Sequence, residues 1–99
     1  MPKIKIGSEE HELRPETATM GFRRHTYIPW REKLTKAEGE AQAIDLMVEG
    51  VSLFVPLSVE QLFDVLPNDE AAIAAIIGDC LVACGMRKSA APEGEAKAQ

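Results

Sequence analysis

The stretch NDEAAIAAIIGDCLVACG, residues 68–85, decides the fold expected for this chain. Its large apolar residues recur at the spacing that places them along one side of an α-helix. They are Ile73, Ile76, Ile77, Cys80, Leu81 and Cys84. Asn68 is suited to cap the first turn, and Gly85 suits the left-handed conformation at a helix exit. The pattern predicts a core helix over residues 68–85, around which the rest of the domain packs.

A second helix is expected directly upstream, over residues 58–66. Ser58 and Gln61 have the spacing of a capping box, in which two side chains satisfy the first free backbone N–H groups of a helix. Pro67 ends this helix because it cannot continue the hydrogen-bonded pattern. The buried side is assigned to Leu62, Phe63 and Leu66.

Thr35 and Glu38 repeat the capping-box spacing and open a longer helix, predicted over residues 36–54. Apolar residues at helical spacing support this helix. They include Ile44, Met47, Val48 and Val51. Val55-Pro56 then ends it.

Residues 3–14 predict a β-hairpin, because KIKI (residues 3–6) and EHEL (residues 10–13) both alternate in polarity. A turn at Gly7-Ser8, with Gly7 at positive φ, pairs lysines with glutamates on one face. A turn at Ser8-Glu9 leaves the same faces. The other face then carries Ile4, Ile6, His11 and Leu13.

A further helix is expected over residues 16–27, after Arg14-Pro15. Ile28-Pro29 should end it, because proline lacks a backbone N–H and restricts the residue before it. Trp30 is expected to anchor the core. Together these segments predict an α+β fold in which an N-terminal β-hairpin packs on about four helices.

The length of 99 residues allows one domain, which we place at residues 1–86. Residues 87–99, RKSAAPEGEAKAQ, hold no large apolar residue, so burial cannot offset the entropy lost on ordering them. We expect a disordered C-terminal tail. The apolar run at residues 71–86 is shorter than the roughly 20 residues that span a bilayer, and the N-terminus lacks a signal-peptide pattern. A cytoplasmic protein without a membrane partner is expected.

Charge divides the chain sharply. Residues 1–36 hold eight Lys/Arg and five Asp/Glu, whereas residues 37–86 hold nine Asp/Glu and no Lys or Arg. Such an acidic half argues against nucleic-acid binding, which depends on clustered cations. The compact basic cluster suits a solvated turn or an interaction patch, and the acids of the long helix suit a solvated face or a docking surface for a basic partner. We take both groups as the candidate protein-binding surface. The residues are Arg23, Arg24, His25, Glu38, Glu40, Asp45 and Glu49.

No pattern in the sequence marks an active site. The sequence lacks the motifs of a nucleophile elbow, a phosphate-binding loop, a dinucleotide-binding fingerprint and a zinc metalloprotease. Cys80 and Cys84 lie on the apolar stripe, where a thiol behaves as a small hydrophobe, and His11 and His25 are far from them without a zinc spacing. We therefore expect no catalytic residues, no cofactor, no metal and no small-molecule substrate.

The stretches KIKIGSEEHELRPETATMGFRRHTY (residues 3–27) and SVEQLFDVLPNDEAAIAAIIGDCL (residues 58–81) carry a resemblance. In layout and local pattern the chain resembles the tail assembly chaperones of long-tailed phages and the related small protein of phage-like gene transfer agents. The resemblance covers about residues 3–86. It implies a non-enzymatic protein that binds tape-measure or tail-tube subunits before they polymerise, encoded by a phage, a prophage or a gene transfer agent.

A different interpretation stays open at this point. The chain would also suit a small adaptor or regulatory module, unrelated to tails, that dimerises through its hairpin edge or its last helix. Self-association is compatible with both interpretations. A DNA-binding helical protein fits the short helices but conflicts with the acidic half.

Overall fold

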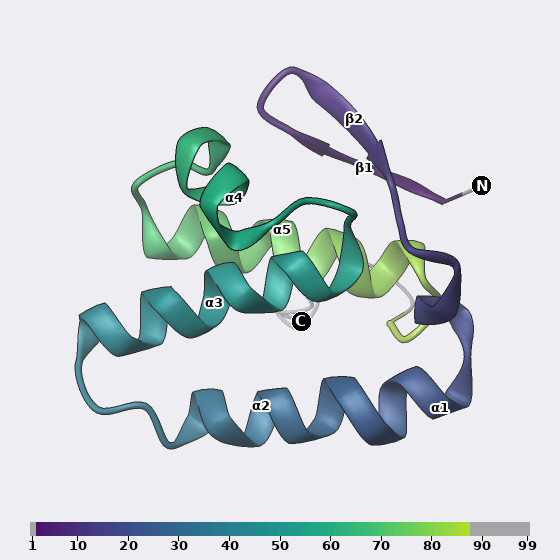
Figure 1. Cartoon of the computed structure of the whole chain (residues 1–99), viewed down its shortest axis with the longest axis horizontal. Coiled ribbons are helices and arrows are strands. Elements are labelled where there is room, and N and C mark those ends of the chain that lie inside the picture. Colours follow the sequence, from purple (N-terminus) through teal and green to yellow (C-terminus); the bar gives the residue numbers. More distant parts are fainter. Residues whose placement is uncertain (1, 88–99) are drawn as a thin grey trace, which may run out of the picture.

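The structure, a computed structural model, describes residues 2–87, which form a two-stranded sheet followed by helices (Figure 1). The strands are β1 (Lys3–Ile6) and β2 (Glu9–Glu12). The helical elements are η1 (Pro15–Ala18), α1 (Met20–Phe22), η2 (Arg23–Tyr27), α2 (Ile28–Thr35), α3 (Glu40–Phe54), α4 (Val59–Val65) and α5 (Glu70–Ala83). The predicted α+β class is confirmed. Apart from Arg87, the tail predicted to be disordered lies outside the described residues.

The hairpin has the predicted faces and the predicted first strand, whereas the second strand spans Glu9–Glu12 rather than residues 10–13. Lys3 lies opposite Glu12 and Lys5 opposite Glu10 in an antiparallel register. The turn uses Gly7, whose φ is +66°, a value that suits the first position of a two-residue hairpin turn. On the inner face the apolar side chains Ile4, Ile6 and Leu13 are buried, and His11 is partly buried at its edge.

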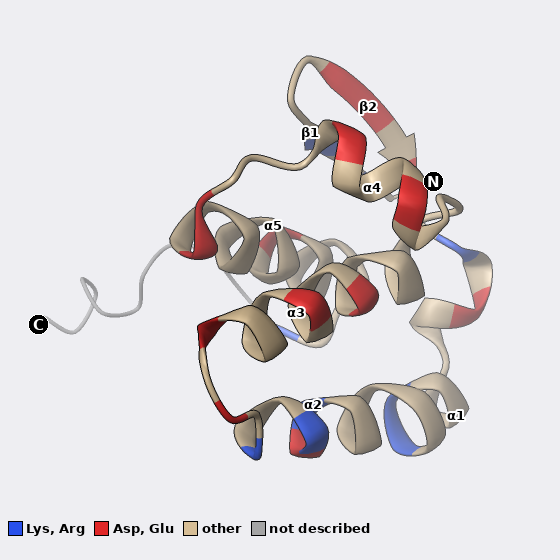
Figure 2. Ribbon diagram, turned by 60° about the vertical axis from the view of Figure 1, so that its left-hand side comes forward, with Lys and Arg blue, Asp and Glu red and all other residues tan. Residues whose placement is uncertain are grey.

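Helix α3 occupies the middle of the molecule. It contacts α2 on one side and α4 and α5 on the other, and the hairpin lies over α5 through β1 (Figures 1 and 2). The apolar stripe predicted for α5 is confirmed, since Ile73, Ile77, Cys80 and Leu81 are buried. A backbone hydrogen bond from the Arg14 N–H to the Phe54 oxygen (2.8 Å) joins the end of the hairpin to the end of α3.

Aromatic rings join the first helical segment to α3. The ring of Phe54 is fully buried, and its centroid lies 5.3 Å from that of Phe22 and 6.2 Å from that of Tyr27, in edge-on arrangements. Trp30 is buried as predicted. These contacts form the centre of the core, which the remaining aliphatic side chains surround.

The break predicted at Ile28-Pro29 is wrong, because residues 20–35 form one helical run. In η2 the hydrogen-bond pattern widens by one residue, so that the Ile28 N–H donates to the Arg23 oxygen. Pro29 then stands in the first turn of α2, where its missing N–H is tolerated. The start of the predicted helix is also displaced: Pro15–Ala18 form a 3-10 turn, and the Thr19 hydroxyl caps α1 by accepting from the Phe22 N–H at 3.1 Å.

The capping box predicted at Thr35 is absent. The Thr35 hydroxyl belongs to the end of α2 and donates to the Glu32 oxygen at 2.8 Å. Helix α3 begins at Glu40 rather than residue 36, because Gly39 adopts a φ of +95° that interrupts the helical path.

The capping box at Ser58 is confirmed: the Ser58 hydroxyl accepts from the Gln61 N–H at 3.1 Å, and the Gln61 side chain accepts from the Ser58 N–H at 2.9 Å. One assignment on this helix is wrong. Phe63 is 54% exposed, whereas Leu62 is fully buried. Neighbouring residues point about 100° apart on a helix, and α4 contacts α3 along only one side.

Helix α5 runs over Glu70–Ala83, within the predicted limits of 68–85. Its N-terminal cap is Asp69, not Asn68: the Asp69 carboxylate accepts from the Ala71 N–H at 3.3 Å. The predicted helix exit is confirmed, since Gly85 has a φ of +92°.

Candidate functional site

The basic cluster predicted to bind a partner lies in η2, with Arg23, Arg24 and His25 all exposed. Two apolar side chains flank the arginines: Met20 is 79% exposed and Ile28 is 37% exposed. Together Met20, Arg23, Arg24 and Ile28 line a shallow hollow of about 290 Å³, which we call the α1–α2 patch. His25 does not line it.

The α1–α2 patch is held in place by the opposite side of its helical run. The Trp30 indole N–H donates to the Leu46 oxygen at 2.8 Å, across the contact between α2 and α3. The Trp30 ring lies directly on Gly50, where an added Cβ would overlap with it. Since the ring occupies the inner side of the run, Met20 and Ile28 are left facing solvent.

The predicted acidic residues lie elsewhere. Glu40, Asp45 and Glu49 belong to α3, and Glu38 lies in the loop before it, with its backbone N–H donating to the Gln42 side chain at 2.7 Å. Among residues 2–87, no ion pair joins them to Arg23 or Arg24. The structure therefore divides the seven predicted residues between the basic run of residues 20–35 and an acidic segment made of α3 and the loop before it, as the colouring in Figure 2 shows.

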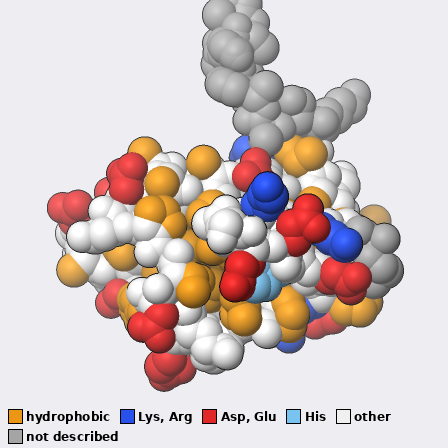
Figure 3. Space-filling model, turned by 90° about the horizontal axis from the view of Figure 1, so that it is seen from above, with side chains coloured by type: hydrophobic (Ala, Val, Ile, Leu, Met, Phe, Trp, Pro, Cys, Tyr) orange, Lys and Arg blue, Asp and Glu red, His pale blue; other side chains and the backbone are white. Residues whose placement is uncertain are grey.

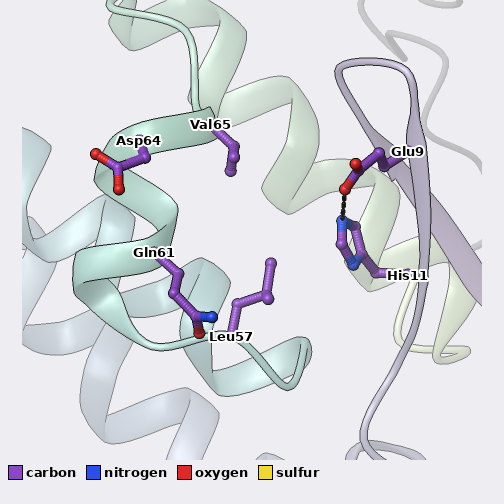
Figure 4. Close-up of a pocket in the computed structure, with 6 residues that line it drawn as sticks. All are labelled: Glu9, His11, Leu57, Gln61, Asp64 and Val65. Carbon is purple, nitrogen blue, oxygen red and sulfur yellow. Dashed lines mark ion pairs between the residues drawn. The ribbon is translucent and has the colours of Figure 1, made fainter.

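A second surface was missed in the sequence analysis. A cleft of about 270 Å³ lies between β2 and α4, and we call it the β2–α4 cleft (Figure 4). Its lining residues are Glu9, His11, Leu57, Gln61, Asp64 and Val65. The incorrect assignment of Phe63 to the core is the reason. Phe63 and Val65 both lie on the exposed side of α4, and Val65, which is 46% exposed, lines the cleft.

The charged groups of the β2–α4 cleft come from both walls. His11 Nε2 lies 3.8 Å from Glu9 Oε1 on the strand, whereas Asp64 lies on the helix opposite with its carboxylate directed away from this pair (Figure 4). In the part of the chain that the structure describes, no Ser, Thr, Cys or Lys lines the cleft as a nucleophile beside the histidine. What the lining offers is carboxylates, an imidazole and two aliphatic side chains, which suit binding.

The cysteines have the predicted position on the buried stripe. Both are free thiols, with Cys80 buried and Cys84 partly buried. Burial, with the neighbouring Asp79 carboxylate adding to it, raises the pKa of Cys80 to about 12, so this thiol is neutral near pH 7. No group of three or more His, Cys, Asp or Glu side chains is placed to hold a metal ion in the described part of the chain.

None of the helices within residues 2–87 is both long and apolar enough to cross a bilayer by itself; α3 and α4 reach the length only together, with a bend of 108° between them.

Comparison of the chain with protein-family models, with curated proteins and with solved structures finds no match.

Proposed function

We propose that this protein is a non-enzymatic binding protein that assists the assembly of a phage-like tail by holding an apolar segment of a tape-measure or tail-tube subunit. The observation that carries the proposal is the α1–α2 patch, in which exposed Met20 and Ile28 lie beside two arginines. A methionine side chain adapts to irregular apolar partners, and arginine pairs with carboxylates. The segment bound there is thus an amphipathic helix with apolar and acidic side chains.

The layout of the chain supports the same proposal. The hairpin leading into a helix and the short helix before a terminal apolar helix are the features on which the resemblance to tail assembly chaperones rests. A protein that delays polymerisation has to cover an apolar surface of its partner reversibly, and a small exposed patch is suited to that.

Co-expression with the tape-measure and tail-tube proteins encoded by neighbouring genes tests the proposal. We expect co-elution at a defined stoichiometry in size-exclusion chromatography with light scattering, and a larger soluble fraction of the partner. Arg23→Glu with Arg24→Glu should abolish co-elution, because the reversed charges repel the acidic segment.

Lys33→Glu with Lys36→Glu is the matched control, since both lysines are exposed at the end of the same helical run and neither lines the hollow. Co-elution should survive this change. A partner that aggregates equally with and without the protein would sink the proposal and favour the dimerising adaptor. Equal loss of binding in this control would mean that overall charge, not the α1–α2 patch, governs the interaction.

A further inference from the structure

The outer edge of β2 presents backbone groups that β1 does not use. In an antiparallel pair, every second residue exchanges hydrogen bonds with its opposite residue. A two-residue turn makes Ile6 and Glu9 such a pair, and the bond from the Leu13 N–H to the Pro2 oxygen (3.0 Å) continues the same alternation. The N–H and C=O groups of Glu10 and Glu12 therefore point away from β1, along the edge of the sheet.

The β2–α4 cleft lies beside that edge. Figure 4 shows His11 and Glu9 on one wall, α4 on the other, and Leu57 between them. A strand that paired with the edge of β2 would direct alternate side chains to the sheet face that carries Glu9 and His11. Those side chains would enter the cleft, where Leu57 and Val65 supply apolar contacts.

Acidic side chains surround this place. Glu9 and Asp64 line the cleft, and Glu10 and Glu12 are exposed on the opposite face of β2. Seen from the side of the hairpin, hydrophobic and acidic side chains lie around a histidine, with basic side chains between the acidic ones farther along the same face (Figure 3). Among residues 2–87, no Lys or Arg lines the cleft. On the outer face, Lys5 and Lys3 of β1 lie opposite Glu10 and Glu12 and offset part of their charge. An extended segment beside β2 that carries Lys or Arg on both of its faces would meet Glu9 on the cleft face and these two glutamates on the other.

The same charges disfavour a second copy of this chain at the edge. Pairing β2 with the β2 of another copy would bring glutamates opposite glutamates, because the strand reads EEHE. Like charges directly opposite each other destabilise a sheet. The edge is therefore suited to a basic partner and not to self-pairing.

We propose that β2 and α4 bind an extended, basic segment of a partner protein, which joins the hairpin as a third strand and inserts an apolar side chain between Leu57 and Val65. Main-chain hydrogen bonds to Glu10 and Glu12 supply affinity, and the cleft selects alternate side chains. This surface is separate from the α1–α2 patch, so the inference stands whether or not the protein acts in tail assembly.

The test uses the full chain and a synthetic peptide of about eight residues that carries Lys on both faces of the strand and a single central Val. We expect saturable binding in fluorescence anisotropy, together with slower hydrogen exchange of the Glu10 and Glu12 amides. The same peptide methylated on every second backbone nitrogen should lose binding, because it cannot complete the strand pairing. A counterpart in which Glu replaces Lys should not bind.

Variants locate the site. Glu9→Lys with Asp64→Lys should weaken binding by about tenfold or more, and both positions are exposed enough for the fold to tolerate the change. Glu16→Lys with Glu32→Lys reverses two exposed acids that do not line the cleft and serves as the matched control. Equal weakening by this control, binding that survives backbone methylation, or a dimer that displaces the peptide would each overturn the proposal. The variant Arg23→Glu with Arg24→Glu should bind the peptide normally. A failure of the α1–α2 patch in tail assembly can therefore be told apart from a failure of peptide binding at the cleft.

Discussion

The α1–α2 patch and the β2–α4 cleft both expose aliphatic side chains, but they differ in charge and in backbone. Arginines border the patch, whereas carboxylates border the cleft. The patch belongs to a helix, whose backbone groups bond within the helix, so only its side chains recognise a partner. The cleft borders a strand edge, whose backbone groups are free to pair. One surface is suited to a helical, acidic partner and the other to an extended, basic one.

The two surfaces are also held in place by different contacts with the core of the molecule. The patch is held on α3 through Trp30, whereas the cleft depends on α4 and on the hairpin, which rests on α5. Substitutions at these separate supports should therefore affect one surface and spare the other. A substitution in α5 should affect both.

Near neutral pH the largest effect is expected at Gly50, the support of the α1–α2 patch. In Gly50→Ala the new methyl group overlaps with the Trp30 ring, which must move away from α3. We expect a net loss of about 1–3 kcal/mol in the free energy of unfolding, after the helix-propensity gain of about 1 kcal/mol is included. Urea unfolding followed by the fluorescence of the single tryptophan measures it.

Gly78→Ala is the matched control, because the nearest atom to an added Cβ is the tip of the flexible Arg87 side chain, at 3.0 Å. This helical change should be neutral or stabilising by up to about 1 kcal/mol. In Gly50→Ala the cleft should still bind the basic peptide while the patch loses its partner. Loss of both activities would show that the two surfaces are not independent.

The next effect concerns α5, which supports both surfaces. Because the pKa of Cys80 is about 12 in the folded protein against an ordinary value of 9.0, the unfolded thiol ionises first as the pH rises. The contribution of the neutral, buried thiol to the free energy of unfolding is fully present below pH 9 and is lost as the pH rises from 9 to about 12. The loss is roughly 1 kcal/mol per pH unit in this window.

Cys80→Val keeps an apolar side chain at this position but cannot ionise. The free energy of unfolding of the original chain should therefore fall relative to that of the variant above pH 9, as measured by urea titrations at several pH values. Parallel curves for the two proteins would show that the Cys80 thiol is not linked to folding.

Much of the fold could be predicted because the decisive signals are local. Alternation in residues 3–6 and 10–13 established the strands, and helical spacing identified Cys80 and Leu81 as buried. The predicted helix break failed for a physical reason. Pro29 cannot donate a backbone hydrogen bond within a helix. The wider turn of η2 places Pro29 in the first turn of α2, where the missing N–H is tolerated. The contact of the neighbouring Trp30 with α3 also favours continuation of the helix.

The candidate surfaces were only partly predictable. Arg23 and Arg24 stood out as a cluster in sequence, but their apolar neighbours could be recognised as exposed only after the Trp30 contact fixed the inner side of the helix. The β2–α4 cleft joins residues about fifty positions apart, from Glu9 to Val65. Its walls come together through the packing of α3 against both α4 and α5, which no local pattern reveals.

The smallest effect compares two hydroxyls that look alike in sequence. Thr35 and Ser58 both begin a capping-box pattern, but only Ser58 caps a helix, and that helix forms one wall of the β2–α4 cleft. Ser58→Ala should cost about 1 kcal/mol. Thr35→Ala removes only an exposed bond to the Glu32 oxygen and should cost less than about 0.5 kcal/mol.

Hydrogen exchange separates the two cases more sharply than global unfolding. Ser58→Ala should speed the exchange of amides in α4 and weaken binding of the basic peptide, since the wall that carries Gln61, Asp64 and Val65 opens more often. Partner binding at the α1–α2 patch should not change, because Trp30 and Gly50 keep their contact. If Thr35→Ala weakened the cleft as much as Ser58→Ala, the end of α2 would have to communicate with α4 through α3, and the two surfaces would be coupled rather than merely adjacent.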